Sequence, residues 1–149
     1  MTSSIENYSF GIEYTPSTVS SPPQLSIETL EQAGIRFIRL QWVDLINNIR
    51  FRVIPIAYFK KMLASSRPSV SITKVALGLV FISTAPGFSA IGEYLYVVDW
   101  SSVRVCPYAT GHASVMGWFE EKVPVPGPDG LPTLKVEICP RTILKRVVE

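Results

Sequence analysis

Apolar and polar positions alternate with two different periods along this chain, and the changes of period mark the expected elements. Short apolar runs rich in β-branched and aromatic residues predict strands over 35–44, 49–54, 70–82, 93–98, 103–106 and 112–122. Spacings of three and four predict short helices over 27–33 and 56–65. Strands predominate, and the order helix, hairpin, helix, further strands predicts an α+β domain with one or two helices on one face of a mixed sheet.

The chain divides into three regions on composition and pattern. Residues 1–25 are rich in Ser, Thr and Pro and lack periodicity, which predicts a flexible N-terminal arm. Residues 26–138 hold the strands, and Ser26 and Gly34 are suited to begin and end the first helix. Residues 139–149 open another helix, whose apolar stripe requires something to pack against. We therefore interpret this last segment as the start of a linker helix to a missing domain.

The first predicted hairpin places one carboxylate among apolar side chains. The pair 47–48 is two asparagines, which tolerate the positive φ of a tight turn. With a two-residue loop, Asp44 faces Phe51 and Trp42 faces Val53. Because side chains alternate across a sheet, Asp44 then shares a face with Ile38, Leu40, Trp42, Phe51 and Val53. A carboxylate there is either solvated at the rim or offered to a site that another element completes.

Composition narrows the class of protein. The 149 residues are 47% hydrophobic and only 17% charged, which indicates surfaces that meet a partner. The net charge of +2, without a basic run, argues against a nucleic-acid partner. No apolar stretch is long enough to predict a membrane span, and the N-terminus lacks the pattern of a signal peptide. Two cysteines without metal or redox spacing fit a reduced, cytoplasmic setting.

Other chemistry-bearing residues have structural interpretations. His112 is the single histidine and is expected to begin a strand, because a metal ligand needs companions. Cys106 lies six residues before it, without an evident third member of a catalytic group. Arg50 and Arg52 alternate with apolar residues and are expected on the solvated face of a strand. We therefore predict no metal-binding or cofactor-binding residue in this chain.

Four segments, in order and at compatible spacing, resemble the glutamine synthetase family. They are FIRLQWVD with RFRVIP (37–44, 50–55), GEYLYVVD (92–99), PY with HASV (107–108, 112–115) and CPRTILKR (139–146). The match covers about residues 26–149. Details of the second and third segments look more like the fungal and bacterial glutamine-synthetase-like ligases than the housekeeping enzyme.

The resemblance implies a β-grasp N-terminal domain. In the family, such a domain packs against the catalytic domain of a neighbouring subunit in a ring-shaped homo-oligomer, and the active site lies between them. The reaction is ATP-dependent formation of γ-glutamyl phosphate, followed by attack of ammonia or another amine. The ATP and the Mg²⁺ or Mn²⁺ ions are held by the catalytic domain, whose segments are not in this sequence. Alone, the chain is therefore expected to bind no cofactor and to be inactive.

One catalytic residue follows from the resemblance. Asp44 matches the family aspartate that helps to bind ammonium, a role suited to a carboxylate because it attracts a cation and accepts its proton. Two positions depart from the family pattern. Asn47 replaces the turn glycine, and Gly87-Phe88-Ser89-Ala90 stands where the family carries Gly-Ser-Ser.

Three hypotheses follow for the whole chain. It is the N-terminal part of a glutamine-synthetase-like ligase, or a naturally short, non-catalytic paralogue that acts as a binding or regulatory module on a full-length ring, or an unrelated α+β interaction domain. The apolar stripe of the last helix favours the first. Four ordered motif matches disfavour the third.

Overall fold

The computed structural model describes residues 25–148, so that the predicted N-terminal arm lies almost entirely outside the described residues. The elements are α2 (Ile27–Gln32), β1 (Phe37–Val43), β2 (Ile49–Pro55), α3 (Ile56–Leu63), β3 (Ser69–Thr73), the 3₁₀ helix η1 (Lys74–Leu77), β4 (Leu79–Val80), β5 (Ser83–Thr84), β6 (Glu93–Val105), β7 (His112–Pro126), β8 (Pro132–Lys135) and α4 (Pro140–Val148). Among these residues, no helix has the length and apolar character that crossing a membrane requires.

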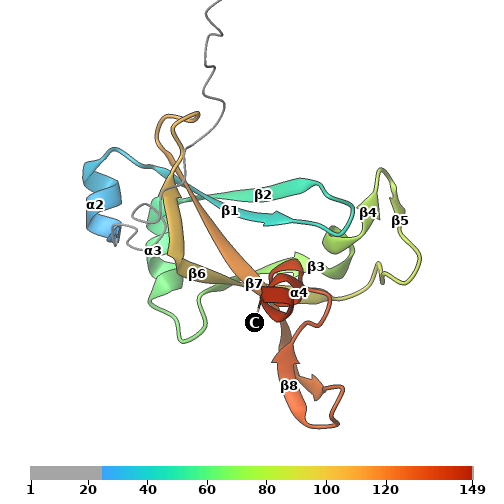
Figure 1. Cartoon of the computed structure of the whole chain (residues 1–149). Coiled ribbons are helices and arrows are strands. Elements are labelled where there is room, and N and C mark those ends of the chain that lie inside the picture. Colours follow the sequence, from blue (N-terminus) through green and yellow to red (C-terminus); the bar gives the residue numbers. More distant parts are fainter. Residues whose placement is uncertain (1–24, 149) are drawn as a thin grey trace, which may run out of the picture.

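The main sheet is mixed and open, and it confirms the predicted α+β class. Its strand order is β2-β1-β7-β6-β3, and β8 pairs with the far part of β7 (Figure 1). Strands β1 and β7 are parallel, whereas the other pairs are antiparallel. The short strands β4 and β5 form a separate hairpin beside the end of the β1–β2 loop (Figure 1).

One face of this sheet carries the core. Alternation along the strands brings to that face the buried side chains of Ile38, Leu40, Val70, Ile72, Tyr94, Tyr96, Ala113, Val115 and Phe119. Leu30 of α2, Phe59 of α3 and Cys139 before α4 belong to the same cluster. The helices therefore cover the same sheet face, as the sequence predicts.

The first helix begins and ends where the sequence predicts. Ser26 caps it, because the Ser26 hydroxyl oxygen accepts a hydrogen bond from the Thr29 amide at 3.1 Å. Gly34 follows the helix with φ of +75°, a conformation that favours glycine.

The register of the β1–β2 hairpin differs from the prediction. Ile49 pairs with Val43, not with Ile46, so that the ladder is shifted by three residues. Because an odd shift moves side chains to the other face, Phe51 and Val53 do not share the core face with Leu40. They are half exposed on the outer face, and the predicted common face of Asp44, Phe51 and Val53 is wrong.

Two other strand predictions are also wrong, one in where a strand ends and one in the kind of element. The strands predicted separately over 93–98 and 103–106 are one strand, β6, which runs without a break from Glu93 to Val105 and includes residues 99–102. Both of its halves pair with β7, and a register shift between Asp99 and Arg104 takes up the extra residues. The predicted strand over 70–82 is instead β3, η1 and β4.

The terminal helix α4 confirms the predicted helix start at Pro140, but it buries little apolar surface. Thr142 is buried, whereas Ile143 is 39%, Leu144 61% and Val147 78% exposed. Most of the predicted stripe therefore faces solvent in the described part of the chain.

Candidate functional site

Asp44 organises the loop that joins β1 to β2. Its Oδ1 accepts hydrogen bonds from the Ile46 amide at 3.0 Å and the Asn48 amide at 2.8 Å. The Asp44 amide donates to the Asn48 carbonyl at 2.9 Å, which closes the loop. Asn47 has φ of +66°, as predicted for a turn asparagine. The carboxylate thus holds a five-residue loop, 44–48, in place of the predicted two-residue turn.

The second carboxylate oxygen of Asp44 pairs with Arg50. The Arg50 Nε lies 2.5 Å from Oδ2, and the Asp44 side chain is fully buried. The Arg50 Nη2 donates to the Leu79 carbonyl at 2.9 Å, and the Leu45 amide donates to the Leu77 carbonyl. This arrangement ties the β1–β2 hairpin to η1 and β4. Arg50 was predicted on a solvated strand face, but it is only 27% exposed and is the cation beside the carboxylate.

This geometry bears on the amine role predicted for Asp44. Both carboxylate oxygens already accept bonds from donors within the described residues, and a guanidinium stands where a bound ammonium would pair with Oδ2. A divalent metal does not fit here, because its ligands would have to be oxygens and the contacts of Asp44 are N–H donors. Across residues 25–148, no group of three His, Cys, Asp or Glu side chains is placed to hold a metal ion. The amine role stays a prediction.

The other singled-out residues lie elsewhere. His112 pairs with Phe37, at the opposite end of β1 from Asp44, and the two rings stack at 5.0 Å. Its Nδ1 accepts a hydrogen bond from Arg39 Nε at 3.4 Å. Cys106 is buried, and its amide donates to the His112 carbonyl. The described contacts thus give both residues structural roles.

A second polar group, which sequence reasoning missed, joins α4 to β6. The Arg141 Nη2 donates to Asp99 Oδ2 at 2.8 Å, and the guanidinium lies 4.2 Å from the centre of the Trp118 ring. The Ser101 amide and hydroxyl both donate to Asp99 Oδ1. The partners are 42 residues apart, and nothing in the local pattern indicates the pair.

The pKa values of two groups near this pair depart from their ordinary values. Burial by itself would raise the pKa of Asp99, but the hydrogen bonds from Ser101 and Arg141 and the nearby guanidinium outweigh it and hold the pKa below the usual value. Burial raises the pKa of Tyr96, whose hydroxyl donates to the Gln41 carbonyl at 2.5 Å. Asp99 is therefore ionised, and Tyr96 neutral, at neutral pH.

The depressed pKa of Asp99 gives a testable dependence on pH. The Asp99–Arg141 pair contributes stability that is present above the unfolded-state pKa of about 3.9 and is lost as the pH falls through the lower folded-state value. We expect the free energy of unfolding to fall as the pH is lowered below about 4, by at most about 1 kcal/mol from this partly exposed pair. Urea denaturation across this range should show a weaker acid dependence in Asp99→Asn. Asp129→Asn, in an exposed loop, is the matched control, and equal profiles for the two variants would contradict the assignment.

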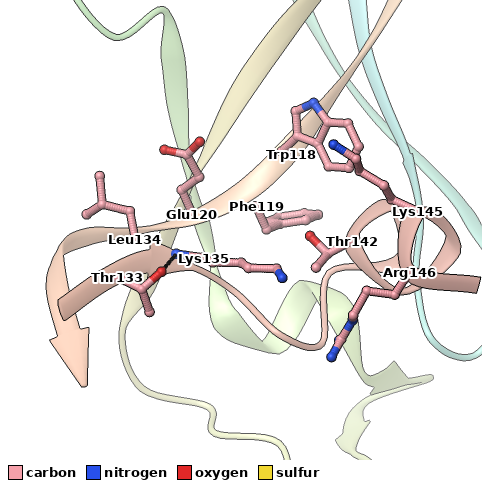
Figure 2. Close-up of a pocket in the computed structure, with 9 residues that line it drawn as sticks. All are labelled: Trp118, Phe119, Glu120, Thr133, Leu134, Lys135, Thr142, Lys145 and Arg146. Atoms are coloured by element: carbon pink, nitrogen blue, oxygen red, sulfur yellow. Dashed lines mark hydrogen bonds between the residues drawn. The ribbon is translucent and has the colours of Figure 1, made fainter. Parts of the chain in front are cut away.

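A pocket of about 450 Å³ lies between α4, β7 and β8. Figure 2 shows Lys135, Lys145 and Arg146 around it, together with the rings of Trp118 and Phe119. Lys135 and Arg146 both pair with Glu137, at 3.8 and 2.9 Å. These contacts fix the segment that leads into α4, and they give the two cations an internal partner.

The comparisons with known proteins follow the resemblance found in the sequence. No family model matches the chain. The type-1 glutamine synthetase 1 of Dictyostelium discoideum is 25% identical in an alignment of 140 residues that covers 85% of this chain and 26% of that protein. Solved structures of GmaS have the same fold: an ADP complex matches with a TM-score of 0.56 and a ligand-free form with 0.57, each at 17% identity over 83% of this chain.

The chain therefore resembles glutamine synthetases over most of its length, which confirms the predicted resemblance. It spans about a quarter of the length of the relatives that it matches, 26% of the curated protein and 24 and 25% of the solved chains.

Proposed function

We propose that the chain is the N-terminal domain of a glutamine-synthetase-like, ATP-dependent glutamate–ammonia or glutamate–amine ligase. In this proposal, it forms one edge of an active site between subunits and is not catalytic by itself. The observation that supports it best is the combination of coverage values: over four fifths of this chain matches, and only about a quarter of each relative is matched. The order of the four sequence motifs supports the same position in the ligase.

The contribution of this chain to the active site is proposed to be a rigid edge. The Asp44 carboxylate holds the loop 44–48 through the amides of Ile46 and Asn48. Arg50 pairs with this carboxylate and also donates to the Leu79 carbonyl of β4, which connects the loop to the neighbouring strand. A preorganised loop can help to exclude water from a neighbouring site without reorganising during the reaction. ATP and divalent metals supply the activation of glutamate in such ligases. Because the surroundings of Asp44 do not fit a metal, no metal-dependent step is assigned to this chain.

The outer face of the β1–β2 hairpin is the proposed contact with a neighbouring ligase subunit. Val43, Ile49, Phe51 and Val53 lie side by side on it, and their exposed fractions run from 40% to 66%. Such a contiguous apolar strip on a sheet favours burial against a partner. We propose a homo-oligomer in which this face is covered.

The proposal is tested by assaying the purified 149-residue chain with glutamate, ATP, Mg²⁺ or Mn²⁺, and either ammonia or methylamine. We expect no formation of ADP or of a γ-glutamyl amide above the background. Turnover by this chain alone would contradict the proposed division of roles.

The intact mass of the protein from its native source separates the proposal from its alternative. A species several-fold heavier than 16.5 kDa supports a domain of a ligase subunit. A species of 16.5 kDa would instead support the short, non-catalytic paralogue that binds a full-length ring.

A further inference from the structure

A second pocket, distinct from the one in Figure 2, opens where α4 begins above the sheet. Its volume is about 450 Å³, within the range of small-molecule sites. Its inner wall is aromatic and consists of Trp42, Tyr96 and Phe119, from β1, β6 and β7. Leu144 and Met116 stand at the pocket with 61% and 45% of their surfaces exposed. The lining of this pocket is therefore mainly apolar and suits the apolar part of a small ligand.

Two hydrogen-bond donors of this lining lack acceptors. The Trp42 Nε1 and the Arg141 Nη1 are buried and have no hydrogen-bond partner among the residues that the structure describes. Buried donors without acceptors are rare and are destabilising, since each has lost its bond to water. Asp99 engages only Nη2 of Arg141, which leaves the other arm of the guanidinium without a bond.

The surroundings decide which acceptor suits the two donors. Of the described residues that line this pocket, only Arg141 has a charged side chain, a guanidinium with N–H donors and no acceptor. Hydrogen bonds to an ionised acceptor are about twice as strong as neutral ones, and a carboxylate can take two donors at once. The Arg141 side chain is 30% exposed although its Nη1 is buried, so a bond from Nη1 to a ligand requires the guanidinium to rotate toward the opening.

We propose that this pocket binds a small monocarboxylate with an apolar body. The body lies against Trp42, Tyr96 and Phe119, and the carboxylate accepts hydrogen bonds from Arg141 Nη1 and Trp42 Nε1. The site is separate from the Asp44 loop, and the proposal holds whichever function the parent protein has.

The test uses the ¹⁵N-labelled 149-residue chain titrated with 3-phenylpropionate, and separately with 4-methylpentanoate. Each of the three tryptophans gives one indole N–H signal, and Trp42→Phe assigns the signal of Trp42. We expect saturable binding of at least one acid, with a downfield movement of the Trp42 indole proton as it gains an acceptor. The Trp100 signal should stay in place, because that ring packs against Phe59 and does not line the pocket.

Two variants and one analogue test the predicted donors. Arg141→Met should weaken binding about tenfold or more, and Arg141→Lys, which keeps the charge, should weaken it less. Arg104→Met is the matched control, since among residues 25–148 Arg104 donates to the Ser101 and Val103 carbonyls and does not line the pocket. 3-Phenylpropionamide keeps the ring and carbonyl but not the charge, and it should bind less tightly than the acid.

The proposal is overturned by any of three results. They are the absence of saturable binding of both acids, equal binding of the acid by Arg141→Met and the unchanged chain, and binding of the amide as tight as that of the acid. Chemical-shift maps of the variants without ligand show whether each retains the fold. If Arg141→Met fails to fold, Arg141→Lys and the Trp42 signal still decide the outcome.

Discussion

Replacement of Asp44 with alanine is expected to lower the free energy of unfolding by about 3 kcal/mol. The change removes the acceptor of two loop amides, Ile46 and Asn48, and leaves the Arg50 guanidinium without its carboxylate. Breaking a buried ion pair from one side commonly costs about 3–5 kcal/mol. The lower end applies, because the Arg50 side chain is 27% exposed and regains some water. Urea denaturation followed by circular dichroism measures this loss.

Two comparisons make this prediction specific. Asp129→Ala removes an exposed carboxylate that also accepts a hydrogen bond from an amide two residues on, that of Leu131, and it should cost less than about 1 kcal/mol. In a double-mutant cycle with Arg50→Met, the coupling energy of Asp44 and Arg50 should exceed about 1 kcal/mol. A loss for Asp44→Ala no greater than that of Asp129→Ala would contradict the structural role.

This structural role and the predicted amine role lead to different measurements. A loop-holding carboxylate changes the stability of the isolated 149-residue chain, where no substrate is present. An amine-binding carboxylate changes the KM for ammonium of an assembled ligase that contains this domain. Asp44→Asn in both settings therefore separates the two, because the isosteric amide keeps the shape while it removes the charge that attracts a cation.

The hairpin shows why residue pattern predicts an element better than its pairing. The strands and the positive φ of Asn47 follow from apolar runs and turn chemistry, and the structure confirms both. The register depends on the Asp44 carboxylate, which binds the amides of Ile46 and Asn48 and so ends the ladder at Val43 and Ile49. Hydrophobic alternation carries no sign of such a bond.

The long-range contacts of the candidate sites could not be predicted from the local residue pattern either. Strand β6 was divided in the prediction because Asp99, Ser101 and Ser102 have the composition of a turn. In the structure, the Ser102 hydroxyl donates to the Asp99 carbonyl and accepts from the Met116 amide, so that these residues form an irregular part of one strand against β7. Asp99 then meets Arg141 of α4, a pairing that only the assembled sheet creates.

The second large effect is expected at Gly117, in the centre of β7. A Cβ atom at this position would lie 2.2 Å from the Val97 carbonyl oxygen and 3.1 Å from the Tyr96 ring. The oxygen belongs to the backbone of β6, which cannot move aside without disturbing the β6–β7 ladder between Val98 and Gly117. Gly117→Ala should therefore destabilise the chain by about 3 kcal/mol, the upper end for overpacking of an interior.

The matched control for Gly117 is its neighbour Met116, whose side chain is 45% exposed on the other face of the same strand. Met116→Ala should change the free energy of unfolding by about 0.5 kcal/mol or less. Thermal denaturation of both variants compares their free energies of unfolding. A change at the Tyr96 ring would show that the clash is relieved on the β6 side. If the clash is relieved by sliding of β6, the hydrogen bond from the Tyr96 hydroxyl to the Gln41 carbonyl should weaken as well. If Gly117→Ala is as stable as Met116→Ala, β6 and β7 pack less closely at this position than the 2.2 Å approach requires. The pocket that Gly117 and Tyr96 line would then have a different shape.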